Sequence, residues 1–461
     1  MENRNTATGF TGTKKWLLVL STLFITIASQ AANYGNNLAL PFKLAQLQLD
    51  NLYSLYATLP GMGMMISLPL VGTLSTKFGQ KRVALGGIVL HWIVRLVAGL
   101  SGNTVLFTLS WLLMGIASGL YISAAYVIMA VVVTPAERPK FYGYIATASA
   151  VGTLIGPVLT GWVIDTVSPT AGLTIFGVFA IVPLVLLGIL LPNQKGASKS
   201  FDFAGLGLLV TFITCMLLWL NMRGVFFTTV SILGIGLPVL GIAALALMIK
   251  VELKVLNPSV PVRMFSKKRF RATFVVNLLM VAYSTSIAAY AVRYVTMLMG
   301  GSSTLASTIT LPQTIVQAVL GMFVGVIIGR HFKKRFRPMA LLALASFMIS
   351  LLILSTLTPT SSIVLIYVAT AIGGIGQALT QSLFTPFFQS ELKPEEYAAA
   401  QGMYTFSGTG GGTIFGSVCG LCLNLGFSFN QVFLLGAGFL SAALILAVFT
   451  FRFTKEELAK G

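Results

Sequence analysis

Long runs of apolar residues follow one another along the chain, separated by charged residues or by clusters of proline, glycine and asparagine. A helix needs about 20 apolar residues to cross the roughly 30 Å of hydrocarbon in a bilayer. Runs of that size predict fourteen membrane-spanning helices, at residues 16–42, 52–76, 83–101, 105–133, 141–164, 170–192, 203–222, 227–249, 272–299, 303–329, 338–357, 361–388, 398–424 and 429–451. Such continuous runs exclude a transmembrane β-barrel, whose strands alternate polar and apolar residues. The expected fold class is therefore an all-α membrane protein.

Basic residues lie almost entirely on one side of the predicted membrane. If the amino terminus is cytoplasmic, 26 of the 30 lysines and arginines fall in segments on the cytoplasmic side. Cytoplasmic loops of membrane proteins carry such an excess. We therefore expect both termini in the cytoplasm and the chain in the inner or plasma membrane. The net charge of +19 then reflects topology and attraction to anionic lipid, and it does not indicate a nucleic-acid partner.

Two longer polar segments divide the predicted spans into groups of six, two and six. They read PNQKGASKSFD at residues 192–202 and KVELKVLNPSVPVRMFSKKRFR at residues 250–271. This division predicts an amino-terminal six-helix bundle at residues 1–194, two inserted helices and the start of a cytoplasmic loop at residues 195–262, and a carboxy-terminal six-helix bundle at residues 263–461. Repeated bundles of this kind are common in secondary transporters.

The composition limits the chemistry that the chain can carry out. Hydrophobic residues make up 56% of the 461 residues and charged residues only 9%, unlike an ordinary soluble protein. Cys215, Cys419 and Cys422 lie in apolar segments with no histidines at the spacing of metal ligands. The sequence also contains neither a phosphate-binding GxxxxGK[ST] loop nor a nucleophile elbow. We therefore expect no enzymatic activity, no metal, no disulfide and no cofactor.

Two short motifs carry glycines that allow close packing. The segment GTLSTKFGQKR at residues 72–82 follows the second predicted span, and GTLIGPVLTGWVID at residues 152–165 lies in the fifth. Glycine lets two helices approach closely, and proline bends a helix while freeing a backbone carbonyl. A degenerate copy of the first motif, GVIIGRHFKKR, occurs at residues 325–335. These motifs resemble those of the major facilitator superfamily, a family of secondary transporters.

The resemblance is more specific to the fourteen-helix drug:proton antiporter branch of that family. Segments at residues 257–270, 294–312 and 398–416 are similar to that branch. The resemblance implies a major facilitator fold, with two six-helix bundles plus two inserted helices, that works by alternating access. It also implies conformational roles for eight motif residues, Gly72, Lys77, Gly79, Lys81, Gly152, Gly156, Pro157 and Gly161.

The two charged positions expected from the branch are replaced in this chain. The first span ends in NLALP at residues 37–41, which resembles the branch signature, and the register places Ala32 at its acidic position. Trp111 occupies the place of an arginine that the family often uses in proton movement. His91 and Arg95, one turn apart in the third span, are the remaining candidates for proton coupling, since His91 can titrate near neutral pH.

Uncharged polar residues on several spans predict a neutral polar substrate cavity. On the first span, a shared helical face is predicted for four of them, Gln30, Asn33, Tyr34 and Asn37. The resemblance places further candidates on helices that line the cavity: Tyr121, Tyr126, Tyr283, Tyr290, Arg293, Gln377 and Gln381. The alternative is that the amides hold neighbouring helices together, which contributes about 0.6 to 2 kcal/mol for each.

These patterns favour a secondary active transporter that moves small amphipathic molecules, of the multidrug efflux type. We expect a monomer whose partners are the lipid bilayer, a small-molecule substrate and, if the transport is coupled, protons. Two alternatives stay open. The chain could be a facilitator or a carrier of anions or other solutes without proton coupling, with Arg293 holding an anion, or it could be a membrane sensor that does not transport.

Overall fold

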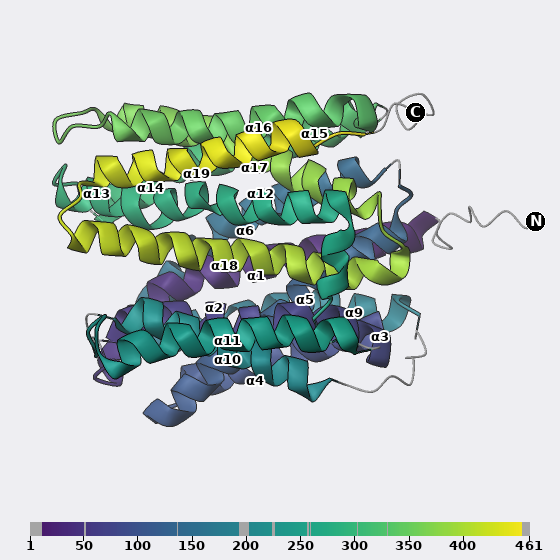
Figure 1. Cartoon of the computed structure of the whole chain (residues 1–461), viewed down its shortest axis with the longest axis horizontal. Coiled ribbons are helices and arrows are strands. Elements are labelled where there is room, and N and C mark those ends of the chain that lie inside the picture. Colours follow the sequence, from purple (N-terminus) through teal and green to yellow (C-terminus); the bar gives the residue numbers. More distant parts are fainter. Residues whose placement is uncertain are drawn as a thin grey trace, which may run out of the picture.

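The computed structural model describes residues 12–49, 52–135, 137–192, 202–223, 226–255, 258, 260–301, 303–329 and 331–453. The regular structure in these residues is helical apart from one isolated bridge between Arg223 and Phe227. The long helices run along one axis of the molecule (Figure 1). This arrangement confirms the all-α prediction.

The first group, called here the amino-terminal helices, begins with the longest helix. Its members are α1 (Gly12–Gln46), α2 (Tyr53–Ser67), η2 (Leu68–Leu70), α3 (Val71–Phe78), α4 (Gln80–Leu100), α5 (Thr104–Val132), α6 (Arg138–Thr166), α7 (Pro169–Thr174), α8 (Phe176–Phe179) and α9 (Ile181–Leu190). Side chains stop the solvent-facing ends of some of them from fraying. Asn103, for example, caps α5 by accepting a hydrogen bond from the Leu106 amide at 3.1 Å.

The second group, called here the carboxy-terminal helices, contains a short π-helical turn within one span. Its members are α12 (Lys268–Thr285), η4 (Ser286–Ala291), α13 (Val292–Met297), α14 (Ser303–Thr308), α15 (Leu311–Gly329), α16 (Phe332–Ser355), α17 (Ile363–Gln389), η5 (Pro394–Glu396), α18 (Tyr397–Asn424) and α19 (Phe429–Thr450). In Figure 1 most of these helices form the upper part of the molecule, while α2, α4 and α5 lie in the lower part.

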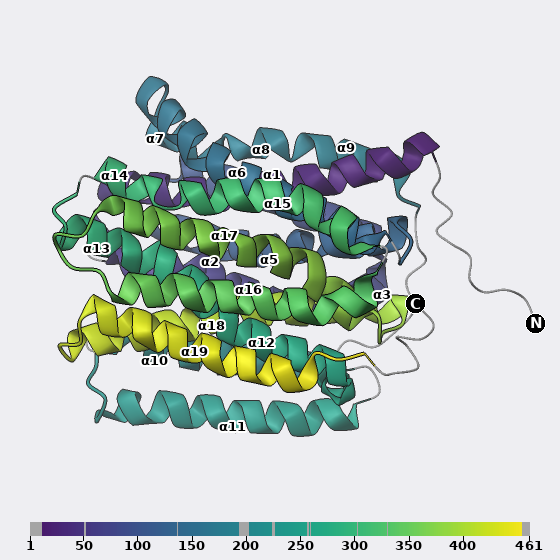
Figure 2. The ribbon, with the colours of Figure 1, turned by 90° about the horizontal axis from the view of Figure 1, so that it is seen from above.

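Two further helices, α10 (Phe203–Met222) and α11 (Ile232–Lys254), form an antiparallel pair between the two groups in sequence. The Trp219 indole of α10 donates a hydrogen bond to the Gly234 carbonyl of α11 at 2.7 Å. Helix α10 buries Ile213, and α11 buries Met248, in an apolar cluster that contains residues of both helix groups. Helix α11 lies at the outer edge of the molecule (Figure 2), and α10 packs against both α11 and α2.

Eleven helices in the described part of the chain are long and apolar enough to cross a membrane. Two shorter apolar helices, Ile181–Leu190 and Leu311–Val324, lie within predicted spans that the structure breaks into pieces. The run at 170–192 becomes α7, α8 and α9, and the run at 303–329 becomes α14 and α15. The count of fourteen spans stays a prediction.

Lysine and arginine side chains gather at one end of the molecule, called here the basic end. Helix α1 begins there and α19 ends there, at the right of Figure 1. Helix termini at this end carry Lys15, Lys77, Lys81, Arg138, Lys254 and Arg269. An apolar cluster joins the two helix groups, and it includes Met65 of α2, Phe388 of α17 and Met403 of α18. The two groups are thus packed against each other.

Candidate functional site

A cavity of about 200 Å³ lies between the amino-terminal and carboxy-terminal helices. Helices α1 and α6 form one wall, and the α12–η4 junction, α15 and α17 form the other. The lining residues are Gln30, Tyr34, Ser149, Thr153, Ser284, Ile287, Ala288, Thr310, Gln313, Thr314, Gln317, Gln377 and Gln381. Eleven of these thirteen side chains are polar and none is charged. Concave sites with a few fixed polar groups are where proteins bind small molecules.

Hydrogen bonds hold several cavity amides in place. Gln30 Nε2 donates to Ser149 Oγ at 2.6 Å within the amino-terminal helices. In the carboxy-terminal helices, Gln377 Nε2 donates to Ser284 Oγ at 2.9 Å. Each of these amides keeps a second polar group, its carbonyl oxygen, that can bind another molecule.

A third amide is oriented from behind the cavity wall. The Tyr283 hydroxyl donates to Gln313 Oε1 at 2.8 Å, and the Tyr283 ring is fully buried and stacked on Phe347. The π-helical turn η4 follows directly and contributes Ile287 and Ala288 to the lining. Such turns often occur at functional positions in helices. The apolar pattern of the predicted span gave no sign of this turn.

The structure brings together four of the residues predicted to form the substrate cavity, Gln30, Tyr34, Gln377 and Gln381. Asn33 is exposed, and the side chain of Asn37 lies outside the described residues. Other predicted residues do not line this cavity: Tyr121, Tyr126, Tyr283, Tyr290 and Arg293. Arg293 is exposed, and Tyr290 is buried with its hydroxyl donating to the Gly416 carbonyl at 2.6 Å.

Sequence reasoning missed Gln313 and Gln317, although both line the cavity. They lie four residues apart in the predicted span at 303–329, which places them on one helical face. The same pattern had singled out the polar face of the first span. It could therefore have identified these two glutamines as well.

Contacts between the two helix groups close the cavity on the side of the basic end. The Tyr142 hydroxyl of α6 bonds to Gln389 Oε1 of α17 at 3.0 Å. Arg138 donates to the Tyr397 hydroxyl at 3.0 Å, and its guanidinium lies 4.9 Å from the centre of that ring. These four side chains are called here the basic-end seal.

Hydrogen bonds from side chains to backbone carbonyls also join α6 and α15, nearer to the cavity. Thr147 Oγ1 donates to the Ala318 carbonyl at 2.9 Å, and Gln317 Nε2 donates to the Ala146 carbonyl at 3.2 Å. Gln317 therefore belongs both to the cavity lining and to the contact between the two groups.

The first glycine motif lies at another contact between the groups. Gly72 packs directly against Ala399 of α18, so a side chain there would collide with that helix. Gly79 has φ 86° and joins α3 to α4, a backbone conformation that glycine adopts without strain. Lys77 lies near the Phe78 ring, and Lys81 is the second residue of α4. Part of the second copy, residues 325–330, lies outside the side chains that the structure describes.

The second glycine motif packs α6 against α1. A Cβ atom at Gly156 would lie 2.5 Å from the Ala31 carbonyl oxygen, and one at Gly152 would lie 2.5 Å from the Ile27 carbonyl oxygen. A Cβ at Gly161 would make only ordinary contact with Leu38. Pro157 lies inside α6 on the next residue. The motif thus places the α1 and α6 walls of the cavity close together.

A separate polar cluster lies within the amino-terminal helices. Arg95 of α4 is only 1% exposed, and it donates to the Asn36 side chain of α1 and to the Leu173 carbonyl of α7. Its Nη1 lies 3.4 Å from His91 Nε2. Ser118 Oγ donates to the Met114 carbonyl at 2.8 Å and lies 3.0 Å from His91 Nδ1. Because a guanidinium can only donate, Nε2 of a neutral His91 accepts from Arg95.

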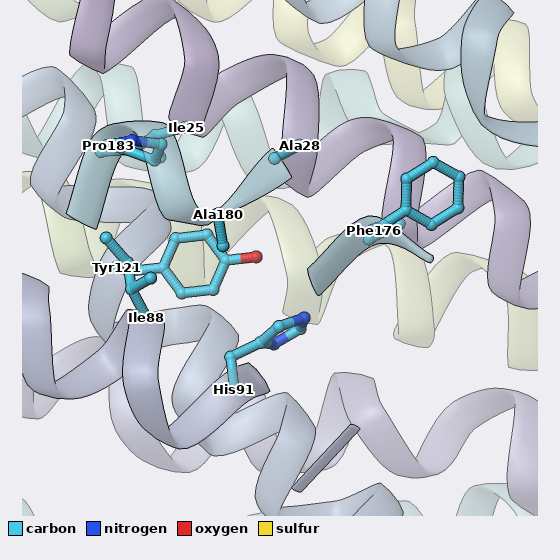
Figure 3. A pocket seen from close by; sticks show the side chains of 9 residues that line it. Ile25, Ala28, Ile88, His91, Tyr121, Phe176, Ala180 and Pro183 are labelled. Carbon is cyan, nitrogen blue, oxygen red and sulfur yellow. The ribbon is translucent and has the colours of Figure 1, made fainter. Parts of the chain in front are cut away.

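A small cavity of about 20 Å³, close to the volume of one water molecule, adjoins this cluster. Figure 3 shows the rings of His91 and Tyr121 beside each other at its edge. Their centroids are 5.2 Å apart. Ala32, at the position where the resemblance implied an acid, also lines this cavity. The cluster and the glutamine-lined cavity share helix α1 but have no lining residue in common.

A salt bridge ties the start of α1 to the start of α6. Lys15 Nζ lies 2.8 Å from Glu137 Oε1. Partial burial raises the pKa of the Glu137 carboxyl, but hydrogen bonds from Lys15 and Thr134 outweigh burial, so its pKa is below the ordinary value. The bridge lies at the basic end and faces neither cavity.

Comparison with known proteins identifies the family. The model of the Major Facilitator Superfamily matches residues 22–414. Multidrug resistance protein 3 of Bacillus subtilis (strain 168) is 25% identical over 372 residues, which are 77% of this chain and 70% of that protein. The multidrug transporter protein MdtP of the same organism is 24% identical over 361 residues, which are 76% of this chain and 65% of that protein. The chain therefore spans about two thirds of the length of these relatives.

Solved structures show the same fold. The human organic anion transporter MFSD10 (TETRAN) superimposes with a TM-score of 0.68 at 15% sequence identity, over 94% of this chain and 99% of that one. At this identity the likeness concerns the fold alone. Together with the family match, it confirms the predicted fold class and the expectation of a transporter rather than an enzyme. The chain belongs to the Major Facilitator Superfamily and is a multi-pass membrane transporter.

Proposed function

We propose that this protein exports small amphipathic molecules from the cell by alternating access, and that the glutamine-lined cavity is its substrate site. The observation that carries the proposal is the position of the cavity. Both helix groups line it, and the basic-end seal closes it on one side. A site between two groups that can part at either end is the arrangement that alternating access requires.

The orientation follows from charge. Loops rich in lysine and arginine stay in the cytoplasm, so the basic end is the cytoplasmic end and both termini lie inside the cell. The seal then closes the cytoplasmic side of the cavity. During transport the seal opens and the opposite ends of the helix groups approach each other.

The moving parts are the two predicted bundles. Residues 1–194 and 263–461 rock against each other, and residues 195–262 supply the inserted pair α10 and α11. The packing of α10 against α2 supports attachment of the pair to the amino-terminal bundle. The protein acts as a monomer in the plasma or inner membrane, because the cavity is complete within one chain.

Efflux of the multidrug type is supported by two relatives whose names describe multidrug resistance and multidrug transport. Uptake through the same cavity is the competing direction. The cavity lining favours a facilitator without proton coupling, because none of its side chains takes up or releases a proton near neutral pH.

Proton coupling, if present, is assigned to His91 and Arg95. They are buried in a membrane span, and Asn36, which accepts from Arg95, lies on α1, which also carries Gln30 and Tyr34 of the cavity. A charge change at His91 would repel Arg95 and disturb its bond to Asn36. That disturbance would reach the cavity through α1.

The test is flux through purified protein in proteoliposomes. Cationic, neutral and anionic fluorescent dyes are compared, and at least one is expected to move faster than through empty vesicles. A variant with Tyr142→Cys and Gln389→Cys, in a background without the native cysteines, is then bridged by a short bifunctional thiol reagent. Bridging should stop the flux, whereas each single variant treated with the reagent should keep it.

Two outcomes contradict the proposal. Absence of flux for every dye, with folded protein in the vesicles, would favour a sensor that does not transport. Undiminished flux after complete bridging would show that the seal does not need to open.

A further inference from the structure

No charged side chain is among the described residues that line the substrate cavity. Its polar lining consists of five glutamines, five serine or threonine hydroxyls and one tyrosine. Buried cations of the amino-terminal helices lie elsewhere: Arg95 belongs to the His91 cluster and Arg138 to the basic-end seal, whereas Lys43 donates to the Gly99 carbonyl at 2.9 Å. None of the three lines the cavity. Arg293 on α13 is exposed and does not line it either.

We propose that this cavity selects uncharged solutes that carry several amide or hydroxyl groups and discriminates against both cations and anions. The inference rests on the proposed function, because it names the substrate class of the same site. It narrows the range of substrates expected for a multidrug exporter, since it excludes lipophilic cations as preferred substrates.

The glutamine amides of the cavity present both hydrogen-bond acceptors and a hydrogen-bond donor to a solute. Gln30 and Gln377 use their NH₂ groups within the protein, so their carbonyl oxygens are left to accept hydrogen bonds. Gln313 uses its carbonyl oxygen for Tyr283, so its NH₂ group is left to donate. A solute with N–H or O–H groups and a carbonyl matches both kinds of group.

An acceptor lies on each wall, and the donor lies on the carboxy-terminal wall. Gln30 is on α1, whereas Gln313 and Gln377 are on α15 and α17. A solute with hydrogen-bonding groups at both ends can therefore contact both helix groups at once. Such a contact favours the conformation in which the walls are at this separation.

Charge is disfavoured because nothing in the lining compensates it. A cation or anion that enters a protein cavity within the membrane loses its hydration shell, and uncharged dipoles replace only part of that stabilisation. A neutral hydrogen-bonding solute loses far less, because amides and hydroxyls take the place of the water it leaves. The lining thus discriminates between solutes mainly by their charge.

Three derivatives of one scaffold test the inference. N-acetyltryptophanamide is neutral, tryptophanamide is a cation at pH 6, and N-acetyltryptophan is an anion. All three share the indole, so they differ mainly in charge. Binding to purified protein in nanodiscs is measured by isothermal titration calorimetry at pH 6. We expect the neutral compound to bind at least about tenfold more tightly than either charged one.

Variants of one glutamine connect the selectivity to the cavity. Gln377→Leu should weaken binding of the neutral compound by about three- to tenfold, because its carbonyl acceptor is lost. Gln377→Glu should reverse the order in favour of tryptophanamide, because the new carboxylate pairs with the ammonium. Gln46→Glu, at an exposed glutamine outside the cavity, should leave the order unchanged.

The outcomes separate this inference from the proposed function. Equal affinities, a preference for a charged compound or absence of binding by the neutral compound would overturn the substrate class. If bridging the seal still stops dye flux in that case, the proposed function stands. If bridging leaves flux unchanged while the neutral compound binds selectively, the cavity is a binding site but the transport cycle proposed above is wrong.

Discussion

Tyr142 of α6 and Gln389 of α17 meet across the boundary between the two helix groups, with the tyrosine hydroxyl 3.0 Å from the glutamine oxygen. Both residues are buried, and they are 247 positions apart in the chain. The same hydroxyl lies 3.1 Å from the Tyr126 carbonyl of α5. A single pair of side chains therefore joins three helices at the end of the cavity where opening has to occur.

Removal of this contact is expected to favour opening of the basic end. Tyr142→Phe deletes one buried hydrogen bond, which contributes about 1 kcal/mol, so the population of the open state should rise about fivefold. Labelling of a single cysteine introduced at Ser149, on the cavity wall, measures access from the basic side. Tyr144→Phe, on the same helix without a bond across the groups, is the matched control.

The Tyr142 result has a clear contrary outcome. If Tyr142→Phe and Tyr144→Phe label at the same rate, the hydroxyl does not stabilise the closed end. The closure would then depend on the apolar cluster around Met65 and Phe388.

The packing of α6 on α1 predicts a strong effect of any side chain at Gly156. Gly156→Ala places a methyl group against the Ala31 backbone, and overpacking of this kind costs about 1 to 3 kcal/mol. Gly156→Leu should abolish transport. Melting of the detergent-solubilised protein and dye flux are measured together. Gly86→Ala, which meets open space, should leave both unchanged, and equal behaviour of the two alanine variants would contradict the packing argument.

An acid at position 32 should create dependence on the proton gradient. Ala32 lines the small cavity with His91 and Tyr121, close to the cluster that contains Arg95. Ala32→Asp adds a carboxylate there, and a charge at the helix centre costs about 2.5 to 3.5 kcal/mol unless it is paired or protonated. Flux with and without an imposed proton gradient is the measurement, and Ala32→Asn is the uncharged control. The expectation fails if the two variants respond equally to the gradient.

His91 can be tested in the unmodified background. If His91 carries the coupled proton, His91→Gln should remove any acceleration of flux by a proton gradient while flux without a gradient continues. Glutamine keeps a hydrogen-bonding side chain near Ser118 and Arg95. Acceleration that survives this substitution would place the coupling elsewhere, and Asp165 near the end of α6 would be the next residue to replace.

The salt bridge at the basic end predicts a small loss of stability in acid. The folded pKa of Glu137 lies below its unfolded value, so the stabilisation is present above about pH 4.3 and is lost as the pH falls through the folded pKa. A partly exposed pair of this kind contributes about 1 kcal/mol. Glu137→Gln should therefore lower the melting temperature slightly at pH 7 and much less at pH 3.5. An equal loss at both pH values would show that the bridge is not responsible.

Local sequence patterns were sufficient to predict the fold class of this chain and its family. A helix that crosses a bilayer must satisfy its own backbone hydrogen bonds and expose apolar side chains, so each span leaves a continuous apolar run. Glycines at close helix contacts leave a spacing that can be recognised, as at Gly152 and Gly156. The polar face that carries Gln30 and Tyr34 was visible for the same reason, because helical periodicity is a property of neighbouring residues.

Only the tertiary structure decided which polar residues share a cavity. Gln30 and Gln377 line the same cavity although 347 positions separate them. Arg293, which the sequence also predicted to line the cavity, is exposed and lies outside the lining. The π-helical turn at Ser286–Ala291 and the hydrogen bonds of Arg95 to Asn36 and Leu173 also arise from packing. Hydropathy reports whether a side chain tolerates lipid or water. It carries no information on which distant helix supplies the partner, because that depends on how the helices of both groups fit together.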